Sequence, residues 1–295
     1  MEHNPVRLYK GPVGVVMEPI VRGLRGHGLA RRHVWVWKAH RAVWRLTRSD
    51  RVLIAGHDML LDQHDSLGLA SGGYEPEEHA WYESVLRPGD LVVEVGANIG
   101  YFSLILARAV GPEGRVISYE PDPELNAILR RNAEHNGYSN IDARQAAVAD
   151  SAGELTFYRS AKSMGDNRLF SHGVDGATFE VRTVALDEDL ADLDRRIDLV
   201  KMDIQGAEPL ALAGFERTLA ERPPRRMLIE FWPHGIVGMG HDPRELVELV
   251  RKHGYTVEEL GGGELDLDAA LARMTVENLE WVNLVCTHAT AEEDR

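Results

Sequence analysis

Short apolar runs alternate with amphipathic stretches from residue 91 almost to the end of the chain. The apolar runs predict strands over 91–95, 116–119, 141–146, 154–158, 181–184, 197–203, 226–231, 255–260 and 280–286. The amphipathic stretches predict helices over 100–110, 123–135, 186–193, 208–220 and 242–253. Repeated strand–helix units with apolar strands are typical of a mostly parallel sheet that has helices on both faces. We therefore predict an α/β fold.

The first part of the chain does not share this alternation. Three elements are expected there: a Pro- and Gly-containing strap over 1–21, a helix over 31–48 and a short hairpin over 51–70. A further helix begins at Pro76, a residue that suits the first helical turn. We accordingly divide the chain into an N-terminal extension, residues 1–72, and a main domain, residues 73–295.

Charge separates the same two parts. The 295 residues carry a net charge of −14, which argues against general nucleic-acid binding by the main domain. Residues 22–51 contain nine Lys or Arg and one acid, Asp50, so this segment alone is near +8. Its helix, with Trp37 and Trp44, could pack on the main domain, contact a membrane surface or a lipid-linked substrate, touch nucleic acid, or meet a second copy of the chain. We expect no nucleic-acid partner.

The hairpin segment is rich in potential metal ligands, namely His57, Asp58, Asp62, His64 and Asp65. Their spacing matches no pattern of metal ligands, so we expect solvated turn residues and no metal site. The only cysteine, Cys286, excludes an internal disulfide. No apolar run reaches the length of about 18–20 residues that a membrane span needs. The first residues lack the apolar core of a signal peptide. These features predict a cytoplasmic protein.

The stretch LVVEVGANIGYF, residues 91–102, predicts a strand, a tight turn and a helix, as in the first unit of a nucleotide-binding domain. Gly96 and Gly100 allow a ligand to approach the backbone closely, although an ordinary tight connection would also favour them. The third glycine of a dinucleotide fingerprint is absent. A nucleoside without pyrophosphate, such as S-adenosylmethionine, therefore fits better. Glu120 ends the next strand, 24 residues after Gly96, where an acid can accept both ribose hydroxyls.

Further candidates stand where the other strands end, because ligands of such sheets bind at the carboxyl ends of the strands. They are Ala147, Asp203 with Gln205, and Glu230 with Trp232 and His234. Asp203 could bind the cofactor's ammonium group, orient a substrate hydroxyl or bind a cation, and it should pair with Lys201. His234 has the pKa range of a general base for a hydroxyl.

Five segments together resemble the FkbM-type family of S-adenosylmethionine-dependent methyltransferases. They are VVEVGANIGYFSLILAR, ISYEPDPELNAILRRNAEHNG, VALDEDL, IDLVKMDIQGAE and MLIEFWPHG. The similarity covers about residues 74–255. The resemblance implies a Rossmann-like three-layer sandwich, with a seven-stranded, mostly parallel sheet of strand order 3-2-1-4-5-7-6 whose seventh strand is antiparallel. It also implies O-methylation of hydroxyls on sugars or polyketide-type natural products.

The resemblance also carries roles to individual residues. Glu94, Gly96, Asn98 and Gly100 match the cofactor turn, Glu120 matches the ribose acid, and Asp203, Gly206 and Glu208 match the stretch D-x-E-G-A-E. Gln205 replaces the usual glutamate, which weakens any metal site built on paired carboxylates there. The residues expected to bind the cofactor are Tyr74, Glu94, Gly96, Ala97, Asn98, Gly100, Tyr101, Phe102, Glu120, Pro121, Ala147 and Asp203. The expected catalytic residues are Asp203 and His234.

We thus predict a methyltransferase that moves the methyl group of S-adenosylmethionine to a hydroxyl of a sugar, a glycan, or a glycosylated or polyketide-type natural product. The N-terminal extension and the polar excursion at 159–178 should cover the acceptor. Two alternatives stay open at this point. One is an NAD-type oxidoreductase, and the other is a non-catalytic nucleotide-binding scaffold that uses the basic helix.

Overall fold

The computed structural model describes residues 50–63, 65, 67–69, 74–159, 169, 177–274 and 280–293. The chain forms two compact units, Met1–Tyr74 and Glu75–Arg295. The helix expected over 31–48 and most of the excursion at 159–178 lie outside the described residues. Within the described part, no helix is long and apolar enough to cross a membrane.

The first unit contains the expected hairpin. Strands β1 (Arg51–Ile54) and β2 (His57–Leu60) pair antiparallel, and the turn residues Ala55 and Gly56 both have positive φ. Two positive φ values in a row suit the right-handed twist of a two-residue hairpin. The expectation of solvated turn residues was wrong for part of this segment. His57, Asp62 and Asp65 are buried, and β2 alternates so that His57 and Met59 share its buried face.

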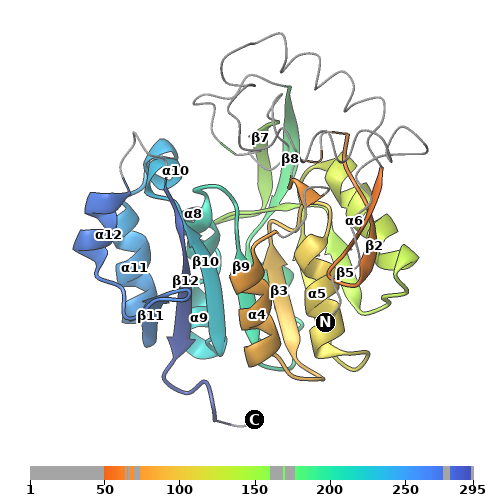
Figure 1. The fold of residues 1–295 in the computed structure, drawn as a ribbon. Helices are drawn as coiled ribbons and strands as arrows, with labels where there is room; N and C mark the ends of the chain where they lie inside the picture. The colour runs from red at the N-terminus through yellow and green to blue at the C-terminus, as the bar shows by residue number, and fades with distance from the viewer. Residues whose placement is uncertain are drawn as a thin grey trace, which may run out of the picture. The chain divides into compact units, whose positions relative to one another are not determined.

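The second unit is built on a seven-stranded sheet of order β11-β12-β10-β9-β3-β4-β5 (Figure 1). Its strands are β3 (Leu91–Val95), β4 (Arg115–Tyr119), β5 (Ile141–Arg144), β9 (Leu199–Met202), β10 (Arg226–Phe231), β11 (Tyr255–Glu259) and β12 (Val282–His288). All neighbouring pairs are parallel except those of β12 with β10 and β11. Numbered within the sheet, this is the order 3-2-1-4-5-7-6 with an antiparallel seventh strand. The predicted fold class is confirmed.

A smaller sheet, of order β6-β8-β7, follows β5. Its strands are β6 (Ala147–Val148), β7 (Gly153–Tyr158) and β8 (Thr178–Val184). The strand predicted over 141–146 is therefore shorter than expected. Its pairing with β4 ends at Arg144, and the chain passes at Ala147 into the second sheet.

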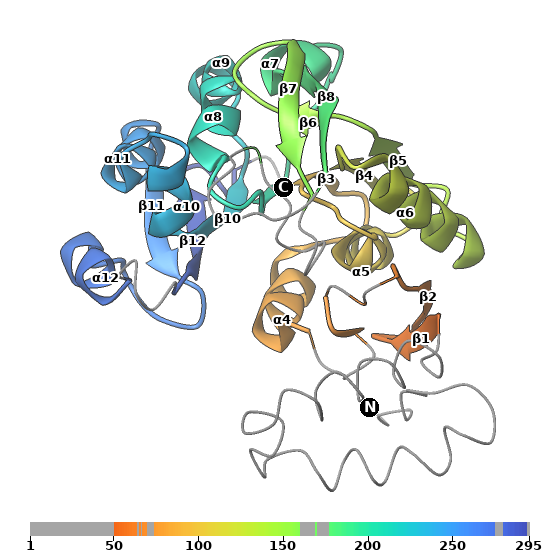
Figure 2. The same cartoon turned by 90° about the horizontal axis from the view of Figure 1, so that it is seen from above.

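Helices cover both faces of the large sheet (Figure 2). Helices α4 (Pro76–Val85), α5 (Tyr101–Val110) and α6 (Pro123–His135) lie on one face, and α8 (Glu208–Ala213), α9 (Glu216–Glu221) and α11 (Pro243–Lys252) lie on the other. The remaining helices are α7 (Leu186–Asp189), α10 (Pro233–Gly238) and α12 (Leu267–Arg273). The last two were not expected, and the helix predicted over 186–193 is limited to four residues.

The helix predicted over 208–220 was also wrong in one respect, because it is divided at Gly214. A β-carbon at Gly214 would lie 2.1 Å from the carbonyl oxygen of Ala149, so the chain there packs backbone against backbone. This tertiary contact interrupts a segment whose apolar pattern is continuous.

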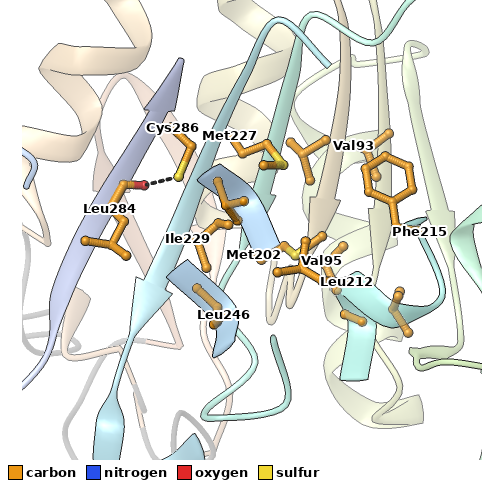
Figure 3. Close-up of a cluster of buried hydrophobic side chains, with 14 of the residues drawn as sticks. Val93, Val95, Met202, Leu212, Phe215, Met227, Ile229, Leu246, Leu284 and Cys286 are labelled. Carbon is orange, nitrogen blue, oxygen red and sulfur yellow. Dashed lines mark hydrogen bonds between the residues drawn. The ribbon is translucent and has the colours of Figure 1, made fainter. Parts of the chain in front are cut away.

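The two faces of the large sheet differ in chemistry. The face under α8, α9 and α11 forms the main apolar core (Figure 3), which includes Val93, Val95, Met202, Leu212, Phe215, Met227, Ile229, Leu246, Leu284 and Cys286. Burial of each such side chain stabilises the fold by about 1.5–3 kcal/mol. The opposite face, under α4 and α5, carries charged and polar residues at paired positions of neighbouring strands. Glu94 lies opposite both Ser118 and Lys201, and Glu230 lies opposite Asn283.

Candidate functional site

The turn after β3 is shaped by a close backbone approach. Gly96 has a φ of +90°, and a β-carbon there would lie 1.9 Å from the carbonyl oxygen of Asp203, at the end of β9. Asn98 also has positive φ, and its Oδ1 accepts a hydrogen bond from the Ile99 N–H at 2.8 Å. Left-handed residues other than glycine are uncommon and occur often at functional sites. The turns that follow β3 and β9 are thereby held against each other.

Glu120 ties this turn to the end of β4. Its Oε2 accepts from the Asn98 N–H at 2.9 Å, and its Oε1 accepts from the Asp122 N–H at 2.8 Å. Each carboxylate oxygen has a further lone pair that can accept a ligand hydroxyl. Burial raises the pKa of Glu120 to about 8, although the two backbone hydrogen bonds oppose the shift.

An ion pair between the buried Asp122 and the half-buried Arg159 lies directly beside Glu120. Asp122 caps α6 and is held by Arg159, with Nε–Oδ2 at 2.7 Å and Nη2–Oδ1 at 2.6 Å. The Arg159 guanidinium also lies 5.0 Å from the ring centre of Phe179 on β8. The ends of β7 and β8 are thus attached to the start of α6, next to the acid that the sequence assigns to ribose.

Lys201 forms the centre of the polar face. Its ammonium lies 3.1 Å from Asp203 Oδ2, 4.0 Å from Glu78 Oε1 and 5.0 Å from the ring centre of Phe102. Burial alone would lower the pKa of Lys201, but the carboxylates of Asp203, Glu78 and Glu94 raise it. The lysine therefore stays charged and is balanced by acids from α4, β3 and β9. The expected pairing of Lys201 with Asp203 is confirmed.

Glu94 is buried beneath the turn, where its Oε2 accepts from the hydroxyls of Ser103 and Ser118 at 2.5 Å and 2.7 Å. Burial raises the pKa of Glu94, and Lys201 opposes this shift. These partners hold Glu94 between β4 and α5, and its assignment to the cofactor stays a prediction.

Gln205 joins the ends of β9 and β10. Its Nε2 donates to Asp203 Oδ1 at 3.3 Å and to Glu230 Oε2 and Oε1 at 3.0 Å and 3.3 Å. Gln205 has positive φ, and so has Gly206, where a β-carbon would lie 2.3 Å from the carbonyl carbon of Gly235. The turn is thus packed tightly against α10. Glu208 begins α8 and accepts from the Ile204 N–H at 2.9 Å.

The structure brings most of the predicted site residues together. Gly96, Ala97, Asn98, Gly100, Glu120 and Asp203 are linked by the contacts just described or by the turn itself. Tyr101 and Phe102 begin α5 with their ring centres 5.0 Å apart, and burial raises the pKa of Tyr101 to about 12. Pro121 connects Glu120 to the cap of α6. All of these assignments to a ligand stay predictions.

Three predicted residues differ from these in their place in the fold. Ala147 lies on β6 of the smaller sheet and does not end β5. His234 lies on α10 with its ring centre 5.3 Å from that of Trp232, whereas the side chains that contact Asp203 are Lys201 and Gln205. Tyr74 belongs to the first unit, so its role stays a prediction.

Sequence reasoning missed Glu78 and Tyr82. Both side chains are buried, and the Tyr82 hydroxyl donates to Glu78 Oε1, while Asn283 Nδ2 donates to Glu78 Oε2 at 3.3 Å. Burial raises the pKa of Glu78 and Lys201 opposes the shift. The two residues are four apart on a helix, and this spacing is the one feature of the sequence that could have predicted their contact.

The site as a whole carries more acid than base. Glu78, Glu94, Asp203 and Glu230 interact with the charge of one lysine, Lys201. In the part of the chain that the structure describes, no group of three or more His, Cys, Asp or Glu side chains is arranged to hold a metal ion.

Comparison with known proteins identifies relatives. A family profile described as "Methyltransferase FkbM domain" matches residues 94–257. The chain is similar to the 31-O-demethyl-FK506 methyltransferase FkbM of Streptomyces tacrolimicus, with 33% identity over 58% of this chain and 75% of that protein. It is also similar to the methyltransferase sdnD of Sordaria araneosa, with 28% identity over 54% and 73% of the two chains.

Solved structures with a similar fold are more distant. One is a putative rRNA methylase from Clostridium thermocellum, with 13% identity, 72% of this chain and 95% of that chain covered, and a TM-score of 0.44. Another is an S-adenosylmethionine-dependent O-methyltransferase from Thermotoga maritima, with 13% identity, coverage of 81% and 77%, and a TM-score of 0.42.

Replacing the buried lysine should destabilise the fold. In Lys201→Met the carboxylates of Glu94, Glu78 and Asp203 lose their common counter-charge, and we expect the free energy of unfolding to fall by about 3–5 kcal/mol. Urea unfolding would measure the change. Lys252→Met is the matched control, because Lys252 is exposed and its 3.4 Å contact with Glu216 lies on the surface. An equal loss in both variants would contradict the central role of Lys201.

Glu120 should make the stability of the ligand-free protein depend on pH. The unfolded carboxyl releases its proton near the ordinary glutamate value, whereas the folded one holds it until about pH 8. A pKa raised by folding stabilises the fold below the unfolded value, and this contribution is lost as the pH rises through the folded value. The free energy of unfolding should therefore fall between about pH 5 and pH 8, by on the order of 1 kcal/mol per pH unit for this group.

Glu120→Gln removes the titrating group, so its free energy of unfolding should fall less than that of the wild type over the same pH range. Urea unfolding at several pH values would measure both slopes. Glu134→Gln, at an exposed position of α6, is the control. Parallel pH profiles for the wild type and Glu120→Gln would show that Glu120 does not titrate in this way.

Proposed function

Because the chain belongs to the FkbM family of methyltransferases, we propose that it methylates a hydroxyl of a sugar, a glycan, or a glycosylated or polyketide-type natural product. The protein is a methyltransferase, and its cofactor is S-adenosylmethionine. Family membership sets aside the alternatives of an NAD-type oxidoreductase and of a non-catalytic scaffold. The proposed part is the chemical class of the acceptor.

The observation that carries the proposal is the set of carboxylates at the carboxyl ends of β9 and β10. Asp203 follows β9, the strand beside β3, and Glu230 lies near the end of β10, the next strand in the sheet. Gln205 joins the two carboxylates. A hydroxyl needs a group that accepts its proton as the oxygen becomes methylated, and a carboxylate can do so. An amine or a thiolate acceptor would depend less on such a group.

The residues of the site suit the cofactor. Bound S-adenosylmethionine supplies an electrophilic methyl group on a positively charged sulfur. The acid excess around Lys201 favours this cation and the ammonium group of the same molecule. Glu120 has lone pairs left for the ribose hydroxyls, and the Gly96–Gly100 turn presents the start of α5 to the methionine part. We assign Asp203 to the amino group or to the acceptor.

The extension is proposed to serve the acceptor. Residues 22–51 carry the basic charge, which would suit an anionic membrane surface, a lipid-linked substrate or contact with a second copy of the chain. The relative from Streptomyces tacrolimicus is named for 31-O-demethyl-FK506, which makes this compound the first acceptor to try.

Removing the ribose acid should weaken cofactor binding. In Glu120→Ala, the loss of the hydrogen bonds between the ribose hydroxyls and the Glu120 carboxyl should raise the dissociation constant of S-adenosylhomocysteine by about 10–100-fold. Isothermal titration calorimetry would measure the affinity, and thermal unfolding would check that the variant is folded. Glu134→Ala on the exposed face of α6 should bind as the wild type does. Unchanged affinity in Glu120→Ala would remove the ribose assignment.

Labelled cofactor tests the acceptor class. The protein is incubated with methyl-labelled S-adenosylmethionine and a hydroxyl panel of methyl glycosides, oligosaccharides and 31-O-demethyl-FK506, and a second panel offers amines and thiols. Mass spectrometry should find the label on oxygen of a compound in the hydroxyl panel. Label on nitrogen or sulfur alone would contradict the proposed function.

A further inference from the structure

Two carboxylates at the site could accept the acceptor's proton, and their surroundings differ. Asp203 Oδ2 lies 3.1 Å from the buried ammonium of Lys201, so its negative charge is neutralised by an ion pair. The ion pair engages Oδ2 of Asp203 and fixes the direction of its side chain. Asp203 is therefore suited to hold a ligand in place.

Glu230 has different partners. Both of its oxygens accept from the neutral amide of Gln205, at 3.0 Å and 3.3 Å, and no ion pair with a cation within 4.0 Å is found for it in the described chain. Burial, followed by the negative charges of Asp203 and Glu208, raises the pKa of Glu230, and Lys201 opposes this shift. A buried carboxylate whose hydrogen-bond donor is neutral suits a group that must take up the proton of a hydroxyl.

Gln205 fixes the position of this carboxylate. Its amide donates to Asp203 and Glu230 together, so the two side chains are kept at a set separation. The backbone of Gln205 is left-handed, with a φ of 57°. The next residue, Gly206, packs closely against the backbone of Gly235, which holds the turn in place. A glutamate at position 205 would bring a third negative charge to the same place unless it held a proton.

The carboxyl end of β10 is also where an acceptor can arrive. Phe231, the residue after Glu230, pairs with Val282, and Trp281 immediately precedes Val282 with 54% of its surface exposed. An exposed indole beyond the end of this pairing offers a flat apolar face. Such a face suits the C–H side of a sugar ring or an apolar natural product.

We propose that Glu230 is the general base that accepts the proton of the acceptor hydroxyl, and that Gln205 is the residue that positions it. This inference rests on the proposed function. The acceptor oxygen forms a bond to the methyl carbon while the bond from that carbon to sulfur breaks. The electron pair of the broken bond returns to the sulfur, which becomes neutral, and the hydroxyl proton passes to a Glu230 oxygen and then to solvent.

The first experiment needs no acceptor. Glutamate side-chain carboxyls are isotope-labelled, the protein is saturated with S-adenosylhomocysteine, and nuclear magnetic resonance follows their titration between about pH 6 and pH 9. The resonance that is absent from Glu230→Gln belongs to Glu230. We expect it to change from the protonated to the ionised form at a higher pH than an ordinary glutamate carboxyl. A Glu230 that stays protonated throughout would overturn the proposal whether or not a hydroxyl is methylated.

The second experiment measures methyl transfer to the hydroxyl panel against pH. Glu230→Gln should lose about 10²–10⁴-fold of the rate and the acid limb of the pH profile, while its affinity for S-adenosylhomocysteine stays within about threefold of the wild type. His234→Gln should keep that limb. Glu248→Gln, at an exposed position of α11, is the matched control and should behave as the wild type does.

Position 205 is tested by two further variants. Gln205→Ala should lower the rate without changing cofactor affinity, and Gln205→Glu should restore much of the rate but move the acid limb to higher pH, because the new carboxyl must hold a proton to donate to Glu230. A pH limb that is the same in both variants as in the wild type would overturn the positioning role.

The outcomes separate the two proposals. A wild-type rate on hydroxyls in Glu230→Gln would overturn the base assignment and leave the proposed function standing. Transfer by the wild type to nitrogen or sulfur alone would overturn the proposed function, and the titration would still decide whether Glu230 can act as a base.

Discussion

The site depends on the ion pairs between the buried ammonium of Lys201 and the acids around it. Moving a charge out of water costs several kcal/mol even after relaxation, so the position is stable only while acids face it. Those acids come from three separate elements, Glu78 on α4, Glu94 on β3 and Asp203 after β9. The charge therefore restricts how α4 packs on the sheet and where the end of β9 lies. One face of the sheet supplies the site and the other supplies the apolar core, because alternation in each strand separates the two.

Close contacts between backbone segments also fix the geometry of the site. The Gly96 turn touches the Asp203 carbonyl, and the Gly206 turn touches Gly235 on α10, so the ends of β3, β9 and β10 are coupled without any side chain between them. Hydrogen bonds at Glu120 add the end of β4 to the same unit. A ligand that lies across these turns meets a rigid surface, which lowers the entropy that binding must overcome.

Much of this arrangement could be predicted from the sequence. The central strands are buried on both faces and consist mainly of apolar residues, so they can be recognised in the sequence. The acids that follow two of them, Glu120 after β4 and Asp203 after β9, can then be placed where ligands of such sheets bind. Glu78 could not be found, because its partner Lys201 is far away in the chain and only the packing of α4 brings them together. Helix α10 was missed because its first residues, Pro233 and Gly235, read as a turn. The division at Gly214 arises from a contact with Ala149 that no local pattern contains.

The amide nitrogen of Gln205, in place of a carboxyl oxygen, determines how the two neighbouring carboxylates are held. Among the described residues, Asp203 has a cation within 4.0 Å and Glu230 has none, so a donor between them must satisfy both without adding charge. An amide does this at every pH, since its N–H groups cannot be lost in the working range. A carboxyl group can do it only while protonated, and its proton would then be shared with Glu230. Because Gln205 does not titrate, Glu230 shares no proton with the side chain at position 205. Glu230 can then change its protonation state while the hydrogen bonds from Gln205 keep their geometry.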